Sequence, residues 1–131
     1  VFARIATHWA CKKQERMTKE VRSGYLEPYD NFSSRVATLR FVQDIPMNPD
    51  SPSYPVVQDI EENLKLFRDH PVKIIWGAHD FVFNDHFLNR WKEIYPQAEV
   101  HRIEDAGHYV VEDAHEHILL LMKEFFYKNP I

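Results

Sequence analysis

Two short segments of this sequence place an acid and a base where they could act together. The segment WGAHD (residues 76–80) ends in Asp80, and the segment EDAGH (residues 104–108) ends in His108. The first begins at the end of a mostly apolar run, residues 72–76, which predicts a buried strand, and the second follows another strand candidate at residues 99–103. Loops at the carboxyl ends of parallel strands converge on one crevice. A carboxylate that accepts a hydrogen bond from a histidine fixes the ring tautomer and stabilises the imidazolium formed in a reaction. We therefore predict that Asp80 and His108 form a catalytic pair.

The chain order of these residues, acid before histidine, matches the α/β-hydrolase order of nucleophile, acid and histidine. In that order the nucleophile lies on a G-x-S-x-G type turn. Neither G-x-S-x-G nor G-x-D-x-G occurs in the 131 residues. We therefore expect the nucleophile to lie upstream of Val1, with this chain forming the C-terminal part of the domain.

The two residues could also have roles without any chemistry, and two other acids nearby could replace Asp80. Asp80 could be a solvated turn aspartate, and His108 a surface histidine. Position after a strand favours the catalytic interpretation for both. Asp85 is expected to begin or precede the next helix. Asp105 is too close to His108 in sequence to reach it easily from across a crevice.

The residues that flank the predicted pair give two further expectations. Gly107 is one of only three glycines, which predicts a backbone that turns sharply just before His108. Phe81–Phe83 follow the acid directly, and two interpretations stay open for them. They could cover the core beneath the loop, or they could line an apolar pocket.

Eight histidines raise the question of a metal site, but their spacing argues against one. His115 and His117 are two apart on a predicted helix and point to nearly opposite faces. The H-E-x-x-H spacing is absent, and no cysteine or carboxylate pattern completes a set with His79 or His86. We expect neither a metal nor another cofactor.

Composition excludes several other classes of protein. The net charge is −4 and no basic cluster occurs, which argues against nucleic-acid binding. The longest apolar run, Ile118–Met122, is too short to span a bilayer, and no leader is recognisable. The scattered glycines rule out a P-loop or dinucleotide loop. The single cysteine, Cys11, fits a reducing compartment, so a cytoplasmic location is expected.

The first half of the chain is predicted to be helical. One helix presents an apolar face at helical spacing. Thr18 is expected to cap a second helix, which runs towards Tyr25 and stops before Pro28. Asn31 or Ser33 is expected to cap a third helix. The apolar face of the first helix consists of Phe2, Ile5, Ala6 and Trp9, and the inward face of the third of Val36, Leu39 and Val42.

The second half alternates helices and strands after a proline-rich linker at residues 46–55. Helix, strand, helix, strand and helix follow in turn, which is typical of crossover units on a parallel sheet. Two strands leave an open apolar edge, so further strands are expected to complete the sheet. Asp113 is expected to cap the last helix. The predicted strands are residues 72–76 and 99–103; the helical stripes are Val57, Ile60, Leu64 and Phe67, then Phe87, Leu88, Trp91, Ile94 and Tyr95, then Ile118, Leu119, Met122, Phe125 and Phe126.

The motifs resemble those of a known family. WGAHD and EDAGHYVVED are similar to the acid and histidine loops of α/β-hydrolases related to haloalkane dehalogenases and epoxide hydrolases. The segment GYLEPYDNFSSRVATLRFVQDIP (residues 24–46) resembles the helical cap of these enzymes. With WGAHDFVFNDHF, it makes the resemblance strongest to the β-lactone decarboxylases of bacterial olefin biosynthesis. The similarity extends over nearly the whole chain.

This resemblance implies an α/β fold in which residues 1–56 form a helical cap and linker and residues 57–131 the C-terminal part of the hydrolase core. It implies Asp80 as triad acid, His108 as triad base and an aspartate nucleophile on the N-terminal part of the domain. The reaction would pass through a covalent ester on a hydrophobic substrate, and an olefin-pathway enzyme would associate with its partner enzymes. Haloalkane dehalogenase or epoxide hydrolase activity is an alternative, and a non-catalytic binding protein on the same fold is another.

Overall fold

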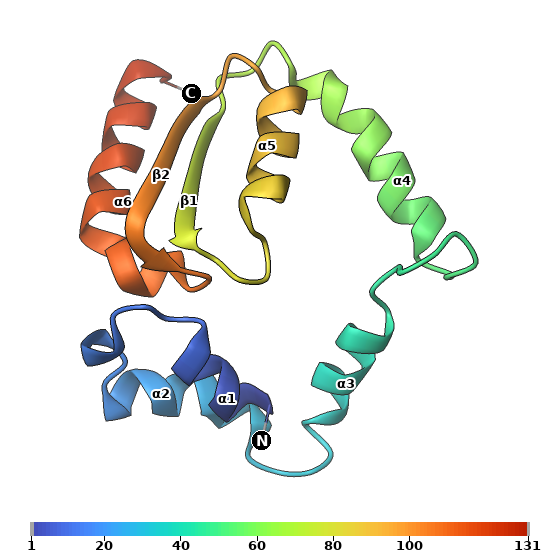
Figure 1. The fold of residues 1–131 in the computed structure, drawn as a ribbon, viewed down its shortest axis with the longest axis vertical. Helices are drawn as coiled ribbons and strands as arrows, with labels where there is room; N and C mark the ends of the chain where they lie inside the picture. Colours follow the sequence, from blue (N-terminus) through green and yellow to red (C-terminus); the bar gives the residue numbers. More distant parts are fainter. Residues whose placement is uncertain (1, 131) are drawn as a thin grey trace.

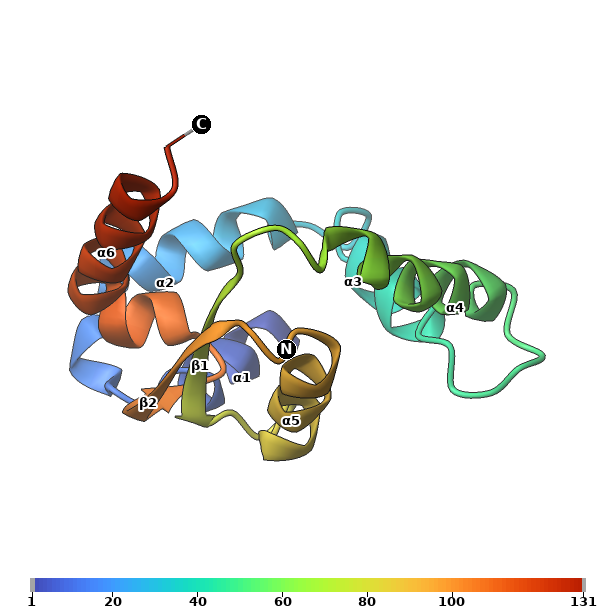
Figure 2. The same cartoon turned by 90° about the horizontal axis from the view of Figure 1, so that it is seen from above.

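The computed structural model describes residues 2–130, and its centre is a two-stranded parallel sheet (Figure 1). Strand β1 (Lys73–His79) and strand β2 (Glu99–Gly107) are joined by helix α5 (Asp85–Ile94). Helix α6 (Val110–Lys128) follows β2 and packs against both strands. The two helices lie on opposite sides of the sheet (Figures 1 and 2). The predicted alternation of helices and strands in this half is confirmed.

The two strands keep a regular register until a bulge near their carboxyl ends. Lys73 pairs with Glu99 and Gly77 with Ile103, but His79 pairs with Gly107. While β1 advances by two residues, β2 therefore advances by four, and it bends towards β1 there. Because of the bulge, His79 pairs with Gly107, so the residues that follow the two strands, Asp80 and His108, begin side by side.

The bulge explains why β1 contains a glycine. A Cβ atom on Gly77 would overlap the carbonyl oxygen of Gly107 and lie 2.9 Å from the carbonyl oxygen of Ala106. Only a residue without a side chain allows this approach. The structure also corrects the predicted strand ends, because most of WGAHD and EDAGH belongs to the strands rather than to the loops after them.

A small apolar core lies between β2 and α6. Ile103 and Ala106 of β2 are buried against Ala114 and Ile118 of α6. Helix α6 is kinked at Ala114, where φ is −144° and ψ is 28°. The kink separates a short first turn from the long remainder of the helix. The helix begins two residues after His108. The core residues Ala106 and Ala114 therefore hold the chain on both sides of the predicted catalytic histidine.

The first half of the chain is helical, as predicted, and its first two helices pack on each other near the carboxyl end of the sheet (Figure 1). Thr18 caps α2 as predicted, since its side chain accepts a hydrogen bond from the Val21 amide. The elements are helix α1 (Phe2–Trp9), 3₁₀ helix η1 (Gln14–Arg16), helix α2 (Lys19–Leu26), 3₁₀ helix η2 (Glu27–Tyr29), helix α3 (Val36–Gln43), helix α4 (Tyr54–Asn63) and 3₁₀ helix η3 (Leu64–Phe67).

Helices α3 and α4 extend away from the sheet (Figures 1 and 2). The apolar stripe of α3, predicted to point inward, is largely exposed in the described residues, although Leu39 and Val42 border a cavity that α1 and α2 also line. The N-cap prediction for α3 is wrong: the helix begins after Arg35 without a side-chain cap, and Asn31 instead accepts a hydrogen bond from the Ser34 amide. The exposed fractions of the stripe are 44% for Val36, 57% for Leu39 and 47% for Val42.

The proline-rich linker is shorter than predicted. Helix α4 begins at Tyr54, and Pro55 lies in its first turn, where a missing amide hydrogen costs nothing. The helix therefore crosses the predicted boundary between residues 56 and 57. Across residues 2–130, no helix is both long enough and apolar enough to span a membrane.

Candidate active site

Asp80 and His108 lie in contact at the carboxyl ends of the two strands. The Nδ1 atom of His108 is 2.9 Å from Oδ2 of Asp80 and 3.0 Å from Oδ1. Their side chains are 10% exposed for Asp80 and 27% for His108. The expected meeting of these two residues across the strand ends is thus observed.

The backbone after β1 fixes the carboxylate of Asp80. Its Oδ1 accepts hydrogen bonds from the amides of Val82 at 2.9 Å and Phe83 at 2.8 Å. Its own amide donates to the carbonyl of Gly77, which closes the turn. The backbone binds Oδ1, which also lies 3.0 Å from Nδ1 of His108, whereas Oδ2 contacts the histidine alone. The turn therefore orients the acid without help from any other side chain.

The contact with Asp80 determines how the ring of His108 can react. A carboxylate only accepts hydrogen bonds, so Nδ1 must carry the proton. The neutral ring then has an unprotonated Nε2, the form that can accept a proton from a reacting group. Within residues 2–130, Nε2 makes no hydrogen bond to protein.

Aromatic rings surround His108. The ring centres of Phe83, Tyr109 and Phe81 lie 5.6, 5.9 and 6.3 Å from that of the histidine. Phe83 is held in place because its carbonyl accepts a hydrogen bond from Trp76 Nε1. Phe81 is 59% exposed and Phe83 is 45% exposed, so neither side chain covers a core formed by the described residues. Of the two open interpretations, the structure favours an apolar wall beside the histidine.

The rival acids are engaged elsewhere. Asp85 is the first residue of α5, as expected, and it binds the guanidinium of Arg102, which lowers the pKa of its carboxyl group. Asp105 forms an ion pair with Lys13 at 2.6 Å, which likewise lowers the pKa of Asp105. Neither carboxylate contacts His108.

Sequence reasoning missed a third acid, Asp113. It is fully buried, and its carboxylate accepts hydrogen bonds from backbone amides and a thiol rather than from the start of α6. The predicted role as a helix cap is therefore wrong. The donors are the amides of Gly107 at 2.7 Å, Lys12 at 2.9 Å and Lys13 at 2.7 Å, and Sγ of Cys11 at 3.0 Å.

This network has a clear electrostatic signature. Burial acts to raise the pKa of Asp113, but the hydrogen bonds from Cys11 and the three amides outweigh it and hold the pKa below its usual range. Burial and the adjacent carboxylate raise the pKa of Cys11 to about 12. Asp113 is therefore charged and Cys11 protonated near neutral pH. No sequence motif marks this pairing, because its partners are about one hundred residues apart.

The expected sharp turn at Gly107 is not observed, because no described glycine has a positive φ. The glycine is required for another reason. A Cβ atom at this position would lie 2.7 Å from the carbonyl oxygen of Ala10 and 3.4 Å from the amide nitrogen of Lys12. The segment after α1 passes directly over Gly107, so a side chain cannot fit there.

A second contact joins the helical segment to the histidine loop. The hydroxyl group of Tyr25, in α2, donates a hydrogen bond to Glu112 at 2.9 Å. Its ring stacks on Tyr109 with centres 5.0 Å apart. Burial and the adjacent carboxylate raise the pKa of Tyr25 well above its usual range, so its hydroxyl stays protonated.

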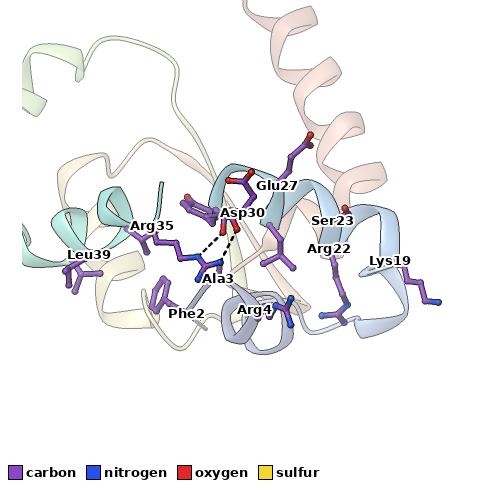
Figure 3. Close-up of a pocket in the computed structure, with 14 residues that line it drawn as sticks. Phe2, Ala3, Arg4, Lys19, Arg22, Ser23, Glu27, Asp30, Arg35 and Leu39 are labelled. Carbon is purple, nitrogen blue, oxygen red and sulfur yellow. Dashed lines mark hydrogen bonds between the residues drawn. The ribbon is translucent and has the colours of Figure 1, made fainter. Parts of the chain in front are cut away.

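A cavity in the helical half of the chain lies away from this pair. Its volume is about 1260 Å³, and α1, α2 and α3 with their connections line it (Figure 3). Arg35 closes one side, where its guanidinium donates to the carbonyls of Tyr29 and Asp30. Neither Asp80 nor His108 borders it. Among residues 2–130, no group of three or more potential metal ligands occurs.

Parallel strands that present an acid and then a histidine at their carboxyl ends match the arrangement of the α/β-hydrolase class. The family model described as "alpha/beta hydrolase fold" matches residues 3–114 of this chain. The chain belongs to the α/β-hydrolase fold family. The family predicted from the motifs is thus confirmed.

Within this family the chain is similar to two proteins named cis-3-alkyl-4-alkyloxetan-2-one decarboxylase. It is 43% identical over 95% of its length to that of Shewanella oneidensis and 40% identical over 88% of its length to that of Xanthomonas campestris. It spans 39% of each relative and matches their C-terminal part. A weaker similarity, 33% identity over 45% of the chain and 19% of the relative, links it to Lipase 1 of Psychrobacter immobilis.

Proposed function

We propose that this chain supplies the acid and the histidine of an α/β-hydrolase active site that acts by covalent catalysis. The single observation that carries the proposal is the contact between Nδ1 of His108 and the carboxylate of Asp80. Asp80 holds the proton on Nδ1 and stabilises the positive charge of the protonated ring. Nε2 is then the ring atom free to interact with the reacting groups.

We propose further that a segment outside this chain supplies the nucleophile. The chain has no G-x-S-x-G or G-x-D-x-G turn and spans 39% of each of the two decarboxylases that it resembles. Large apolar side chains lie exposed on the helices, as they would if another part of the domain covered them. Examples are Phe2, Trp9, Phe41 and Val56. The division into a cap at residues 1–56 and a core at residues 57–131 stays a prediction.

The proposed reaction is the decarboxylation named for the two relatives, with a substrate of the cis-3-alkyl-4-alkyloxetan-2-one type. A carboxylate nucleophile attacks C4 of the lactone ring, and the C4–O bond breaks. This step leaves an ester at C4 and a carboxylate on C3. The C3–carboxylate bond then supplies the electron pair of a C3–C4 double bond, carbon dioxide leaves, and the nucleophile departs as a carboxylate.

His108 has a defined task in this scheme. In its protonated form it stabilises the carboxylate that departs from C4, and Asp80 stabilises the protonated ring. The exposed rings of Phe81 and Phe83 beside it suit the alkyl chains of the substrate. A hydrolase that uses the same pair differently would let Nε2 activate water, which would hydrolyse the ester to a hydroxy acid.

The products decide between these activities. The test protein is a fusion hydrolase, in which this chain replaces the matched C-terminal part of the Shewanella oneidensis relative. It is incubated with a cis-3,4-dialkyloxetan-2-one, and the organic products are separated by gas chromatography with mass detection. A cis-alkene with release of carbon dioxide supports the proposal. A 3-hydroxy acid indicates hydrolysis, and binding of the lactone without any product indicates a non-catalytic binding protein.

Location in the cytoplasm and association with other enzymes of a pathway stay predictions. Cell fractionation and co-purification from the source cells test them. Nothing in the proposed chemistry depends on either.

A further inference from the structure

Asp113 lies in the first turn of α6, five residues after His108, and does not take part in the chemistry proposed above. It is 0% exposed, and four hydrogen bonds converge on its carboxylate. A buried charge is costly unless its surroundings satisfy it, and here every donor comes from outside the helix that carries the residue. Such a site is built for a charged group in one position.

The donors belong to two segments that are far apart in sequence. The amide of Gly107 donates to Oδ2 from the end of β2. The amides of Lys12 and Lys13 donate from the connection after α1, to Oδ2 and Oδ1 respectively. Asp113 therefore ties the residue before His108 to a segment about one hundred positions earlier in the chain.

The same early segment also binds the residue after the histidine. The amide of Tyr109 donates to the carbonyl of Ala10 at 2.7 Å. A Cβ atom on Gly107 would collide with this carbonyl, which shows how closely the two segments pack. The backbone is thus fixed on both sides of His108, by Asp113 at one neighbour and by Ala10 at the other.

We propose that Asp113 is a positioning residue, which orients the ring of His108 towards Asp80 by clamping the histidine loop onto residues 10–13. This inference deepens the proposed function, because it concerns the same histidine. Asp113 has no contact with either ring nitrogen of His108. It acts through the backbone, and the segment that it recruits lies in the part of the chain predicted to be a cap.

The first test does not depend on any activity. In the 131-residue chain, the proton on Nδ1 of His108 gives a low-field NMR signal while it is held by Asp80, and ¹⁵N shifts of the ring report its tautomer. Asp113→Asn replaces one carboxylate oxygen, which accepts a hydrogen bond from at least one backbone amide, by an NH₂ group. The NH₂ group is a donor and cannot accept that hydrogen bond. We expect the low-field signal to be lost and both tautomers to appear. The matched control, Asp85→Asn, removes a carboxylate that binds Arg102 and contacts neither Asp113 nor residues 10–13, and should preserve the signal.

A pair of milder variants decides the matter if Asp113→Asn does not fold. Cys11→Ala removes one donor to Asp113, and Cys11→Ser keeps a donor at the same position. We expect the low-field signal of His108 to broaden in the alanine variant and to recover in the serine variant. The positioning role is overturned if the folded Asp113→Asn variant, or both Cys11 variants, leave this signal unchanged.

The second test uses the fusion hydrolase. Since Asp113 orients the histidine and does not touch substrate, Asp113→Asn should lower kcat by about 10²-fold and leave KM unchanged. Unchanged kcat in an active fusion would overturn the inference. An inactive parent fusion would instead count against the proposed function, while the NMR result on the chain alone would still decide the role of Asp113.

Discussion

Replacing Asp80 by asparagine changes one atom of the proposed pair and leaves the turn intact. The two amides that bind Asp80 both donate to Oδ1, so the carbonyl oxygen of an asparagine would take that position. The amide nitrogen would then stand at Oδ2, 2.9 Å from Nδ1 of His108. Because that nitrogen is a donor, it opposes a proton on Nδ1 and favours the tautomer with the proton on Nε2, although the carbonyl oxygen at the Oδ1 position stays 3.0 Å from Nδ1.

The consequence is a histidine in the wrong tautomer and without a charge partner. The corresponding change in a serine protease triad lowers turnover about 10⁴-fold, with the geometry intact. At 1.36 kcal/mol for each tenfold change, that loss is about 5.4 kcal/mol of transition-state stabilisation. We expect a loss of this order in Asp80→Asn.

Two measurements check this prediction. The first is kcat of the fusion hydrolase, and the second is the ring tautomer of His108 from ¹⁵N shifts. Asp85→Asn is the matched control, because Asp85 is a neighbouring acid that binds Arg102 and not the histidine. The reasoning is refuted if Asp80→Asn retains kcat within about tenfold of the parent, or if it retains the proton on Nδ1.

Three further predictions concern the hydrogen-bond network by which Asp113 joins residues 11–13 to Gly107. Gly107→Ala would place a Cβ 2.7 Å from the carbonyl oxygen of Ala10, so it should destabilise the chain by about 1–3 kcal/mol and lower the thermal midpoint by several degrees, measured by circular dichroism. An unchanged midpoint would contradict the close packing. Burial and a neighbouring carboxylate raise the pKa of Cys11 to about 12, and only a thiolate reacts readily, so iodoacetamide should label it slowly at neutral pH until denaturant is added. Rapid labelling of the folded chain would show that the thiol is not held in this way. Burial acts to raise the pKa of Asp113, but the hydrogen bonds to its carboxylate have the larger effect and lower that pKa below the usual value of 3.8. The charged carboxylate therefore stabilises the fold above pH 3.8, and this stabilisation is lost as the pH falls through the pKa of the folded state. Acid unfolding of Asp113→Asn should therefore depend less on pH in this range, and equal pH dependence in both proteins would contradict the assignment.

Local patterns in the sequence were sufficient to predict most of the elements and to select two residues that lie in contact in the structure. The apolar stripe of α5 and the β-branched run of β1 each follow from spacing alone. Asp80 and His108 could be selected because the ends of neighbouring parallel strands must converge, whatever the rest of the fold. Their contact in the structure is the expected outcome of that topology.

Long-range contacts explain what the sequence could not predict. Asp113 looked like a helix cap because an acid in the first turn of a helix commonly has that role. Its true donors come from residues 11–13 and Gly107, which no local spacing connects. The requirement for Gly107 was recognised, but its cause is the passing carbonyl of Ala10 rather than a turn.

The inward face predicted for α3 failed for a different reason. Helical periodicity identifies an apolar stripe but not what covers it. Val36 and Leu39 are 44% and 57% exposed, and of the two Leu39 borders the cavity that α1 and α2 also line. If the proposed nucleophile-bearing segment forms the rest of the domain, these side chains should become protected when the two parts are joined in the fusion hydrolase.

The central claim is that His108 resolves a covalent intermediate, and the mass of the protein tests it most directly. The fusion hydrolase carrying His108→Ala is mixed with the dialkyl lactone, quenched in acid and measured by intact mass spectrometry beside the parent fusion. The account predicts that the variant carries the added mass of one lactone while the parent returns to its own mass. A variant that forms product as fast as the parent and carries no added mass would contradict it.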